Sequence, residues 1–272
     1  MSIAQVEREV RTQPEMLDRA LADLEPGSLR DGSLLVGAGD SYAASVCVSQ
    51  LSSMKVLALD PLALLDMARL DRDVCIISVS GRTRANLDLA KAARATGQSV
   101  VVVTANPRSP LALLADRVVE LPFRPAPRTP GMLSFTLSLL ALLKMTQPAF
   151  GCDFQTAFRS AKAASRSVAV TKRGTTFMLG NWALHGVSIY GAAKVYELLG
   201  WKAQSEMLQQ FAHTELFSLS RSDSVNILSG VGLTKYENRL HAELVKRGYR
   251  ARIVLPEGRS VVEKLFSAVF AL

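Results

Sequence analysis

The sequence predicts an α/β protein of two similar lobes, each with a parallel β-sheet flanked by helices. Two observations support this fold class. Short apolar segments alternate with helical segments along most of the 272 residues, which is typical of parallel sheets that are buried on both faces. A segment that begins at residue 78 also recurs 151 positions later, which indicates an internal duplication.

The first lobe is expected to begin with a helical arm. The apolar spacing of residues 2–24 predicts an amphipathic helix, with a break or restart at Pro14. After a loop with Pro and Gly, residues 33–51 predict a strand, a tight loop and a helix. The same order repeats in "KVLAL" with "DPLALLDMARL", "VCIISVS" with "TRANLDLAKAARATG" and "SVVVVT" with "SPLALLA", and a last strand is expected at "RVVELPF".

A proline-rich segment separates this lobe from the next. Residues 122–130 contain four prolines, so they should link two halves or line a cleft. Long helices are expected at about 130–148 and 152–171, followed by a strand at "TTFMLG". The expected organisation is therefore an N-terminal arm over 1–32, a first domain over 33–150 that binds phosphate, and a second domain over 151–272.

The repeat aligns without a gap. The matched pairs are Ser78 with Ser229, Gly81 with Gly232, Thr83 with Thr234, Leu89 with Leu240 and Gly97 with Gly248. Any two strand-loop-helix-strand units share some of these features, which is the alternative explanation. Because turn glycines and apolar strand positions match at one offset, we favour duplication.

The loop after "VCII" has the composition of a phosphate site. Ser78, Ser80 and Thr83 bring hydroxyl groups to the end of a parallel strand, and the next helix presents backbone amides with partial positive charge. Gly81 allows the backbone to approach an anion closely. Such residues are also ordinary helix N-caps, but a cap needs one hydroxyl rather than three.

A second loop can contribute to the same site. In "GAGDSY", Gly39 and Ser41 lie at the start of another expected helix. In the repeated copy, Val231 stands at the position of Ser80 and Leu233 at that of Arg82. We therefore expect one phosphate site per chain.

The second lobe offers an acid-base set. Lys194 and Glu197 lie three apart on one helical face, and His213 follows in "QFAHTE". A carboxylate and an imidazole near a phosphate site suit proton transfer next to a sugar carbonyl and ring opening. Taken singly, Glu197 could pair with Lys194 on the helix surface and His213 could be structural.

From about Ser33 onward the chain resembles the sugar isomerase (SIS) family, in particular the isomerase half of glucosamine-6-phosphate synthases, which has two SIS domains. The motifs "GDSY" and "SVSGRT" are similar to the phosphate loops of the family, and "GAAKVYE" and "QFAHTE" to its catalytic segments. The resemblance implies a flavodoxin-like three-layer fold and a phosphate site at Ser41, Ser78, Ser80 and Thr83.

The resemblance also implies catalytic roles. Glu197 would move a proton between C1 and C2, with Lys194 beside it, and His213, often supplied by the neighbouring subunit, would assist ring opening. This implies a homodimer. Four motif positions differ: Val79 and Arg82 replace a Gln and a Glu, and the Thr and Glu of "HTE" replace the Gly and Pro of His-Gly-Pro.

The function expected from these features is a phosphosugar isomerase acting on a ketose or aldose 6-phosphate. The 272 residues contain no segment similar to a glutaminase domain or to the lysine-bearing tail of the synthases, so we do not expect glutamine-dependent amination. An aminosugar-phosphate deaminase and a non-catalytic sugar-phosphate sensor therefore remain as alternatives.

Charge and motif patterns indicate which classes of partner and cofactor are not expected. The net charge of +8 comes from Lys and Arg that are scattered without a basic run, so we expect no nucleic acid partner. "VGAGDSYA" lacks the third glycine of a dinucleotide site and the three cysteines lie far apart, so we expect no cofactor and no metal. The polar N-terminus and the shortness of the apolar runs predict a cytoplasmic protein that does not cross a membrane.

Overall fold

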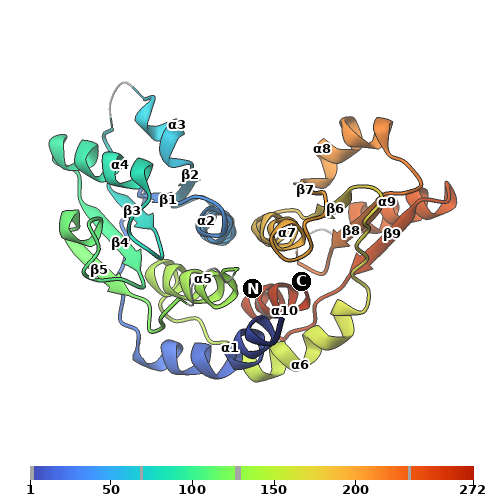
Figure 1. Cartoon of the computed structure of the whole chain (residues 1–272), viewed down its shortest axis with the longest axis horizontal. Helices are drawn as coiled ribbons and strands as arrows, with labels where there is room; N and C mark the ends of the chain where they lie inside the picture. The colour runs from blue at the N-terminus through green and yellow to red at the C-terminus, as the bar shows by residue number, and fades with distance from the viewer. Residues whose placement is uncertain (1–2, 68–69, 126–129, 232–233) are drawn as a thin grey trace. The chain divides into compact units, whose positions relative to one another are not determined.

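The computed structural model describes residues 3–67, 70–125, 130–231 and 234–272. The chain divides into two compact units, Met1–Phe150 and Gly151–Leu272. Each unit is an α/β structure with one parallel sheet between helices, which confirms the predicted fold class (Figure 1). Among the described helices, none combines the length and the apolarity needed to span a bilayer.

The first unit contains a five-stranded parallel sheet in the order β2-β1-β3-β4-β5. This is the flavodoxin-like order. All five strands fall in the segments where the sequence predicts them. Their bounds are β1 Leu34–Val36, β2 Leu57–Leu59, β3 Val74–Ile77, β4 Val100–Thr104 and β5 Arg117–Glu120.

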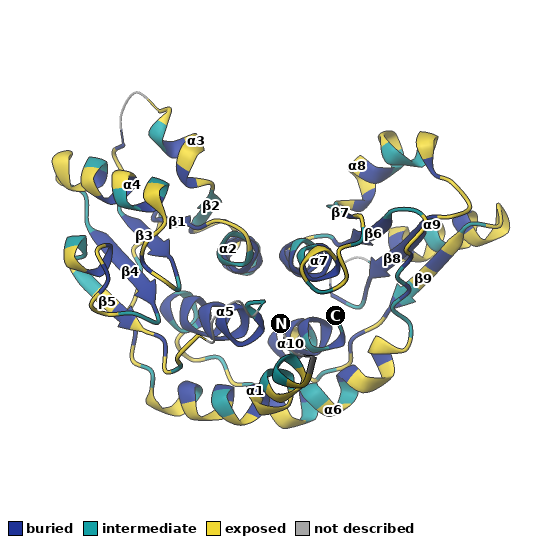
Figure 2. Cartoon of the chain, viewed as in Figure 1, coloured by how far each residue is buried: buried dark blue, intermediate teal, exposed yellow. Residues whose placement is uncertain are grey.

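Helices cover both faces of this sheet (Figure 1). Two helices, α2 (Asp40–Leu51) and α5 (Met132–Thr146), pack together on one face. The helices α3 (Pro61–Leu65) and α4 (Arg84–Ala95) pack together on the other. Figure 2 shows α5 buried along almost its whole length, as its apolar sequence predicts.

The core follows the two-residue period of the strands. Alternate strand residues such as Val36, Ile76 and Val102 point toward α3 and α4, where they join one apolar cluster. The residues between them, including Leu35 and Cys75, are also fully buried. Burial on both faces explains why these strands read as continuous apolar runs.

Helix α1 (Ile3–Asp23) corrects the prediction of a break, because Pro14 lies inside one continuous helix. Pro14 and Leu17 are buried on the side that packs against α5. Two side chains also tie the helices together: the Leu133 amide donates to Glu9 Oε1 at 2.8 Å, and Lys144 Nζ donates to the Leu21 carbonyl at 2.7 Å. This packing offsets the hydrogen bond that a proline cannot donate.

The helix expected at "SPLALLA" is reduced to a single 3₁₀ turn, η1 (Ala112–Leu114). The chain leaves the turn because Ala115 is extended and the Asp116 amide donates to the Val100 carbonyl at 2.8 Å, leading into β5. The start of the turn η1 is also fixed, because the Leu111 amide donates to the Gly81 carbonyl at 3.2 Å. Too few residues remain between these two anchors for a longer helix.

The second unit contains a four-stranded parallel sheet in the order β7-β6-β8-β9. Its strands are β6 Thr176–Leu179, β7 Ala203–Glu206, β8 Ser224–Leu228 and β9 Arg250–Val254. On one face lie α7 (Ala183–Lys194) and α10 (Val261–Ala271), and α6 (Phe154–Ser165) packs against α10. Helices α8 (Leu208–His213) and α9 (Lys235–Lys246), with the turn η3 (Glu215–Ser218), cover the other face (Figure 1).

The structure reproduces the sequence repeat in detail. Both ends of α4 and α9 are 151 positions apart, and Gly97 and Gly248, just after these helices, share a φ of 75°. The amides of Ser78 and Ser229 donate to the carbonyls of Val103 and Val254, which are also 151 positions apart. The repeat partners Gly232 and Leu233 and residues 126–129 of the proline-rich segment lie outside the described residues.

Candidate functional site

The hydroxyl-bearing loops of the first unit follow two adjacent strands, β1 and β3. From β1 the chain continues through α2 to β2 on one side, and from β3 it continues through α4 to β4 on the other side. The two helices therefore start on opposite faces of the sheet. The place where successive helices leave a sheet on opposite faces is called its topological switch point. Ligands of open α/β folds bind in the crevice at this point, beyond the carboxyl ends of the strands.

In the loop between β1 and α2, glycines bring the backbone close to the helix. A Cβ on Gly37 would lie 2.6 Å from Ser41 Cβ, so only glycine fits there. Gly39 is the N-cap of α2 with a φ of 57° and has no side chain to cap the helix. The Ser41 amide instead donates to the Ala38 carbonyl at 3.2 Å, and Asp40 adds a carboxylate to the same turn.

The loop between β3 and α4 makes a tight turn at Gly81. This residue has a φ of 63°, and its amide donates to the Ser78 carbonyl at 3.0 Å. A Cβ at this position would lie 2.0 Å from Ser109 Oγ. Ser109 is buried and supports the loop from the segment after β4, a role that the sequence pattern did not indicate because Ser109 is 28 residues away from Gly81.

The hydroxyl groups of this loop are not used for capping. Thr83 is the N-cap of α4, yet its side chain makes no capping hydrogen bond. Ser80 and Thr83 are exposed, whereas Ser78 is buried with its Oγ 3.5 Å from Thr83 Oγ1. Helix capping therefore does not explain these residues, and their hydroxyls remain able to bind a ligand.

The repeated loop in the second unit is arranged differently. Ser229 Oγ donates a hydrogen bond to Glu237, which is fully buried. This burial raises the pKa of Glu237, against the opposing effect of hydrogen bonds from Ser229 and the Gly230 backbone. The hydroxyl that matches Ser78 is thus engaged with a carboxyl group, and Val231 at the position of Ser80 is buried.

Lys194 and Glu197 form a close ion pair in the second unit. Lys194 ends α7, and Glu197 follows in a π-helical segment, η2 (Val195–Leu199). Their Nζ and Oε2 atoms are 2.5 Å apart, and Lys194 Nζ lies 5.0 Å from the centre of the Tyr190 ring. The Lys194 side chain is only 2% exposed and that of Glu197 is 40% exposed, so the pair is not an ordinary surface contact.

His213 is the last residue of α8 and is exposed. Its Nε2 lies 2.9 Å from Gln209 Nε2, and because an amide nitrogen only donates, the imidazole nitrogen accepts this bond. In the described part of the chain, no hydrogen bond links His213 to Glu197. The structure therefore brings Lys194 and Glu197 together, and it places His213 on a separate element.

Three groups outside the predicted site have shifted pKa values, namely His185, Cys75 and Cys47. Burial lowers the pKa of His185 near the start of α7, with the Glu206 carboxylate opposing this effect. Burial raises the pKa of Cys75 to about 12 and that of Cys47 still further, so both thiols are protonated at neutral pH. The described residues contain no group of three His, Cys, Asp or Glu side chains that could hold a metal ion.

Two parallel sheets flanked by helices form an α/β fold that is also present in solved structures described as phosphosugar isomerases. Residues 33–146 match the family model of the SIS domain. A comparison of the sequence with curated proteins finds no match.

Solved structures share the fold over nearly the whole chain. Glucosamine-6-phosphate deaminase from Thermotoga maritima is 18% identical, with a TM-score of 0.76 and coverage of 97% of this chain and 90% of that one. Tagatose-6-phosphate ketose/aldose isomerase from Escherichia coli is 19% identical, with a TM-score of 0.74 and coverage of 100% and 93%. The C-terminal domain of glucosamine-fructose-6-phosphate aminotransferase from Francisella tularensis is 15% identical, with a TM-score of 0.77 and coverage of 98% and 92%.

These three neighbours are named for three different reactions on sugar phosphates. At identities below 20%, they establish the fold of this chain and leave its reaction open. The choice among reactions must therefore come from the residues of the site.

Proposed function

We propose that the protein is a phosphosugar isomerase that interconverts a ketose and an aldose 6-phosphate. The observation that carries the proposal is the Glu197 carboxylate, which is partly exposed and held 2.5 Å from the buried Lys194 ammonium group. A base for proton abstraction must be both oriented and accessible. Glu197 meets both conditions, since the ion pair orients one oxygen and 40% of the side chain reaches solvent.

The hydroxyl loop of the first unit is the proposed phosphate site. Ser78, Ser80 and Thr83 offer hydroxyl donors at the start of α4, and the helix amides add partial positive charge. Ser41 and Gly39 add donors at the start of α2. Gly81 permits the close approach of the backbone. A phosphate held here anchors the sugar through a group that takes no part in the reaction.

The proposed proton transfer is balanced within the substrate. Glu197 removes the proton from C2 of the open-chain aldose, which gives an enediolate. The proton on O2 then moves to O1, and Glu197 returns its proton to C1, so that O2 becomes the carbonyl oxygen of the ketose. Lys194 keeps the carboxylate oriented through both steps. His213 is proposed to move the proton between the ring oxygen and the anomeric hydroxyl when the ring opens.

Proton exchange in deuterated buffer tests the role of Glu197. Fructose 6-phosphate and glucosamine 6-phosphate are followed by NMR with the wild type and with Glu197→Gln. We expect deuterium to enter C1 or C2 with the wild type, and the rate to fall at least about 100-fold in the variant. The matched control is Glu257→Gln, because Glu257 is also exposed and should keep full activity.

The same experiment separates the alternatives. Release of ammonia from glucosamine 6-phosphate, together with exchange, identifies a deaminase with the same base. Binding of both sugars that weakens in Ser80→Ala, without any exchange, identifies a sensor and overturns the isomerase proposal on these substrates.

We also propose that the second unit is a second SIS domain, with domain limits at 33–150 and 151–272 and an arm over 1–32. Support comes from the shared order of the first four strands and from the 151-residue offset between α4 and α9. We propose a homodimer as well.

A further inference from the structure

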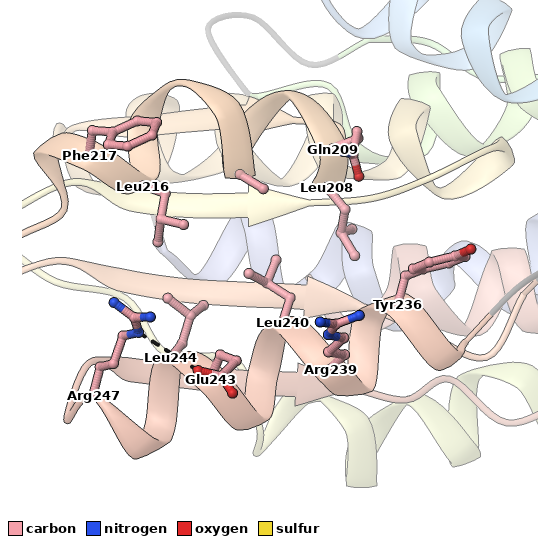
Figure 3. A pocket seen from close by; sticks show the side chains of 11 residues that line it. Leu208, Gln209, Leu216, Phe217, Tyr236, Arg239, Leu240, Glu243, Leu244 and Arg247 are labelled. Atoms are coloured by element: carbon pink, nitrogen blue, oxygen red, sulfur yellow. Dashed lines mark ion pairs between the residues drawn. The ribbon is translucent and has the colours of Figure 1, made fainter.

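A cavity of about 550 Å³ lies within the second unit, between α8 with η3 on one side and α9 on the other (Figure 3). Its floor is apolar and includes Leu208, Leu216, Leu240 and Leu244. The volume falls in the range of small-molecule sites. None of the proposed phosphate or proton-transfer residues lines it.

Each end of the cavity has one arginine, and within the described part of the chain only one of the two arginines makes an ion pair. Gln209, Tyr236 and Arg239 lie at one end, and Phe217 and Arg247 at the other (Figure 3). Arg247 lies 3.8 Å from the carboxylate of Glu243, so its charge is compensated. Among the described residues Arg239 makes no ion pair, and it is exposed.

Exposed aromatic rings mark the rim. Phe217 is 85% exposed and Tyr236 is 56% exposed, although both border an apolar floor. Such residues next to a concave apolar surface are typical of sites that bind a partner with an apolar body. The net charge of +8 adds a general preference for anions.

We infer that the cavity between α8 and α9 binds a small amphipathic carboxylate, with its apolar body over the leucine floor and its carboxylate at Arg239. The Arg239 guanidinium group, which makes no ion pair within the described residues, selects the anionic end, because a guanidinium and a carboxylate form paired charge-assisted hydrogen bonds. A sugar phosphate fits this cavity poorly, since its hydroxyl groups would face leucine side chains without hydrogen-bond partners.

The occupant would be in indirect contact with His213. Gln209 lines the cavity, and its side chain is hydrogen-bonded to His213 Nε2. Displacement of the Gln209 amide by a ligand would therefore change the surroundings of the imidazole. This gives the site a spectroscopic reporter, because the chain has only three histidines, His185, His213 and His241.

The test uses decanoate as the probe and the full chain as the protein. Binding is followed by the imidazole NMR signals and by titration calorimetry, with decanol as the neutral analogue. We expect one decanoate per chain, a shifted His213 signal and an unchanged His185 signal. The affinity should fall about tenfold in Arg239→Gln, the loss of one charge-assisted contact.

Two further variants separate the apolar and the charged parts. Phe217→Ser removes an exposed ring, so it should weaken decanoate binding without unfolding the protein. Arg173→Gln makes the same chemical change as Arg239→Gln on an exposed residue outside the cavity, and it should leave the affinity unchanged. Thermal unfolding of each variant checks that the fold is intact.

The opposite results would overturn the inference. If neither Arg239→Gln nor Phe217→Ser alters decanoate binding, the ligand binds elsewhere. If decanol binds as tightly as decanoate, Arg239 does not select a carboxylate. If Phe217→Ser instead lowers the molecular mass measured by light scattering, a second copy of the chain covers this surface. None of these readouts depends on isomerase activity, so the site and the proposed reaction can fail independently.

Discussion

At the scale of single residues, Gly81 decides whether the loop after β3 can form. Its φ of 63° is unfavourable for other residues, and the space beside it is filled by Ser109 Oγ. We expect Gly81→Ala to lower the free energy of unfolding by about 2 kcal/mol. Sugar phosphate binding, measured by calorimetry, should fall at least about tenfold as the loop shifts.

Gly97→Ala is the matched control for this variant. Gly97 has a similar φ of 75° but no atom within 4 Å of the added Cβ, and it lies after α4, away from the loop. The variant should lose about 1 kcal/mol of stability and keep its affinity for sugar phosphate. Equal binding by both glycine variants would contradict a phosphate site at the Gly81 turn.

Glu237 is a residue whose burial predicts a pH effect. Because its pKa is raised in the folded state, the folded protein holds a proton that the unfolded chain releases above about pH 4.5. The wild type should therefore lose stability as the pH rises through this range, until the folded group also ionises. Glu237→Gln cannot titrate and keeps an oxygen acceptor for Ser229, so it avoids this loss.

Urea unfolding at pH 5 and pH 8 measures this difference. We expect Glu237→Gln to gain stability relative to the wild type between the two pH values, because only the wild-type side chain exchanges a proton on folding. Glu257→Gln, at an exposed carboxylate, should show no such gain. A constant difference between the wild type and Glu237→Gln at both pH values would show that this group does not titrate with folding.

At the scale of elements, the start of α10 is stabilised by a pair of side chains. Ser260 Oγ accepts a hydrogen bond from the Glu263 amide at 3.1 Å. The Glu263 carboxylate accepts from the Arg259 amide at 2.7 Å and from the Asp153 amide at 3.4 Å, the N-cap residue of α6. One carboxylate therefore links the beginnings of two packed helices.

Ser260→Ala should lower the free energy of unfolding by about 1 kcal/mol, because the α10 amide loses its acceptor. Thr234→Ala is the control, since Thr234 is the N-cap of α9 but makes no side-chain capping bond. Chemical denaturation of both variants measures the difference. Equal losses would mean that the hydrogen bond of Ser260 contributes nothing.

At the scale of the whole molecule, the proposed homodimer can be tested by mixing inactive variants. Ser80→Ala removes a proposed phosphate ligand and His213→Gln removes the proposed ring-opening residue. If His213 serves the site of a partner subunit, mixed dimers regain one intact site, and activity returns to about a quarter of the wild-type value after random exchange. Ser80→Ala mixed with Thr83→Ala should stay inactive, because both changes affect the same loop.

No recovery in the first mixture, with exchange of subunits verified by mass spectrometry, would contradict a shared site. His213 would then act in its own chain or would have no role in catalysis.

Much of the fold could be predicted from local sequence patterns. The strands of the first unit, the long helix α5 and the 151-residue repeat follow from apolar periodicity and turn glycines. The prediction at Pro14 was wrong because packing of α1 on α5 offsets a local preference. The prediction of a helix at residues 109–115 was wrong because hydrogen bonds to Gly81 and Val100 limit the turn.

The candidate site could be predicted only in part. The hydroxyl loop and the spacing of Lys194 and Glu197 are visible in the sequence. The absence of a capping bond from the Thr83 hydroxyl and the burial of Lys194 are not. Residue types and their spacing indicate which groups can meet within one turn of helix. They do not indicate which neighbours from other elements remove water from those groups.

The sequence by itself determined the α/β class, the order of strands and helices and the position of the hydroxyl loop. Each depends on interactions between residues that are near in the chain, so a short pattern is sufficient. The tertiary structure decided the contact of Ser109 with Gly81, the burial of Glu237 and the cavity between α8 and α9. These features depend on desolvation and packing by residues that are distant in the sequence, and only folding brings such residues together.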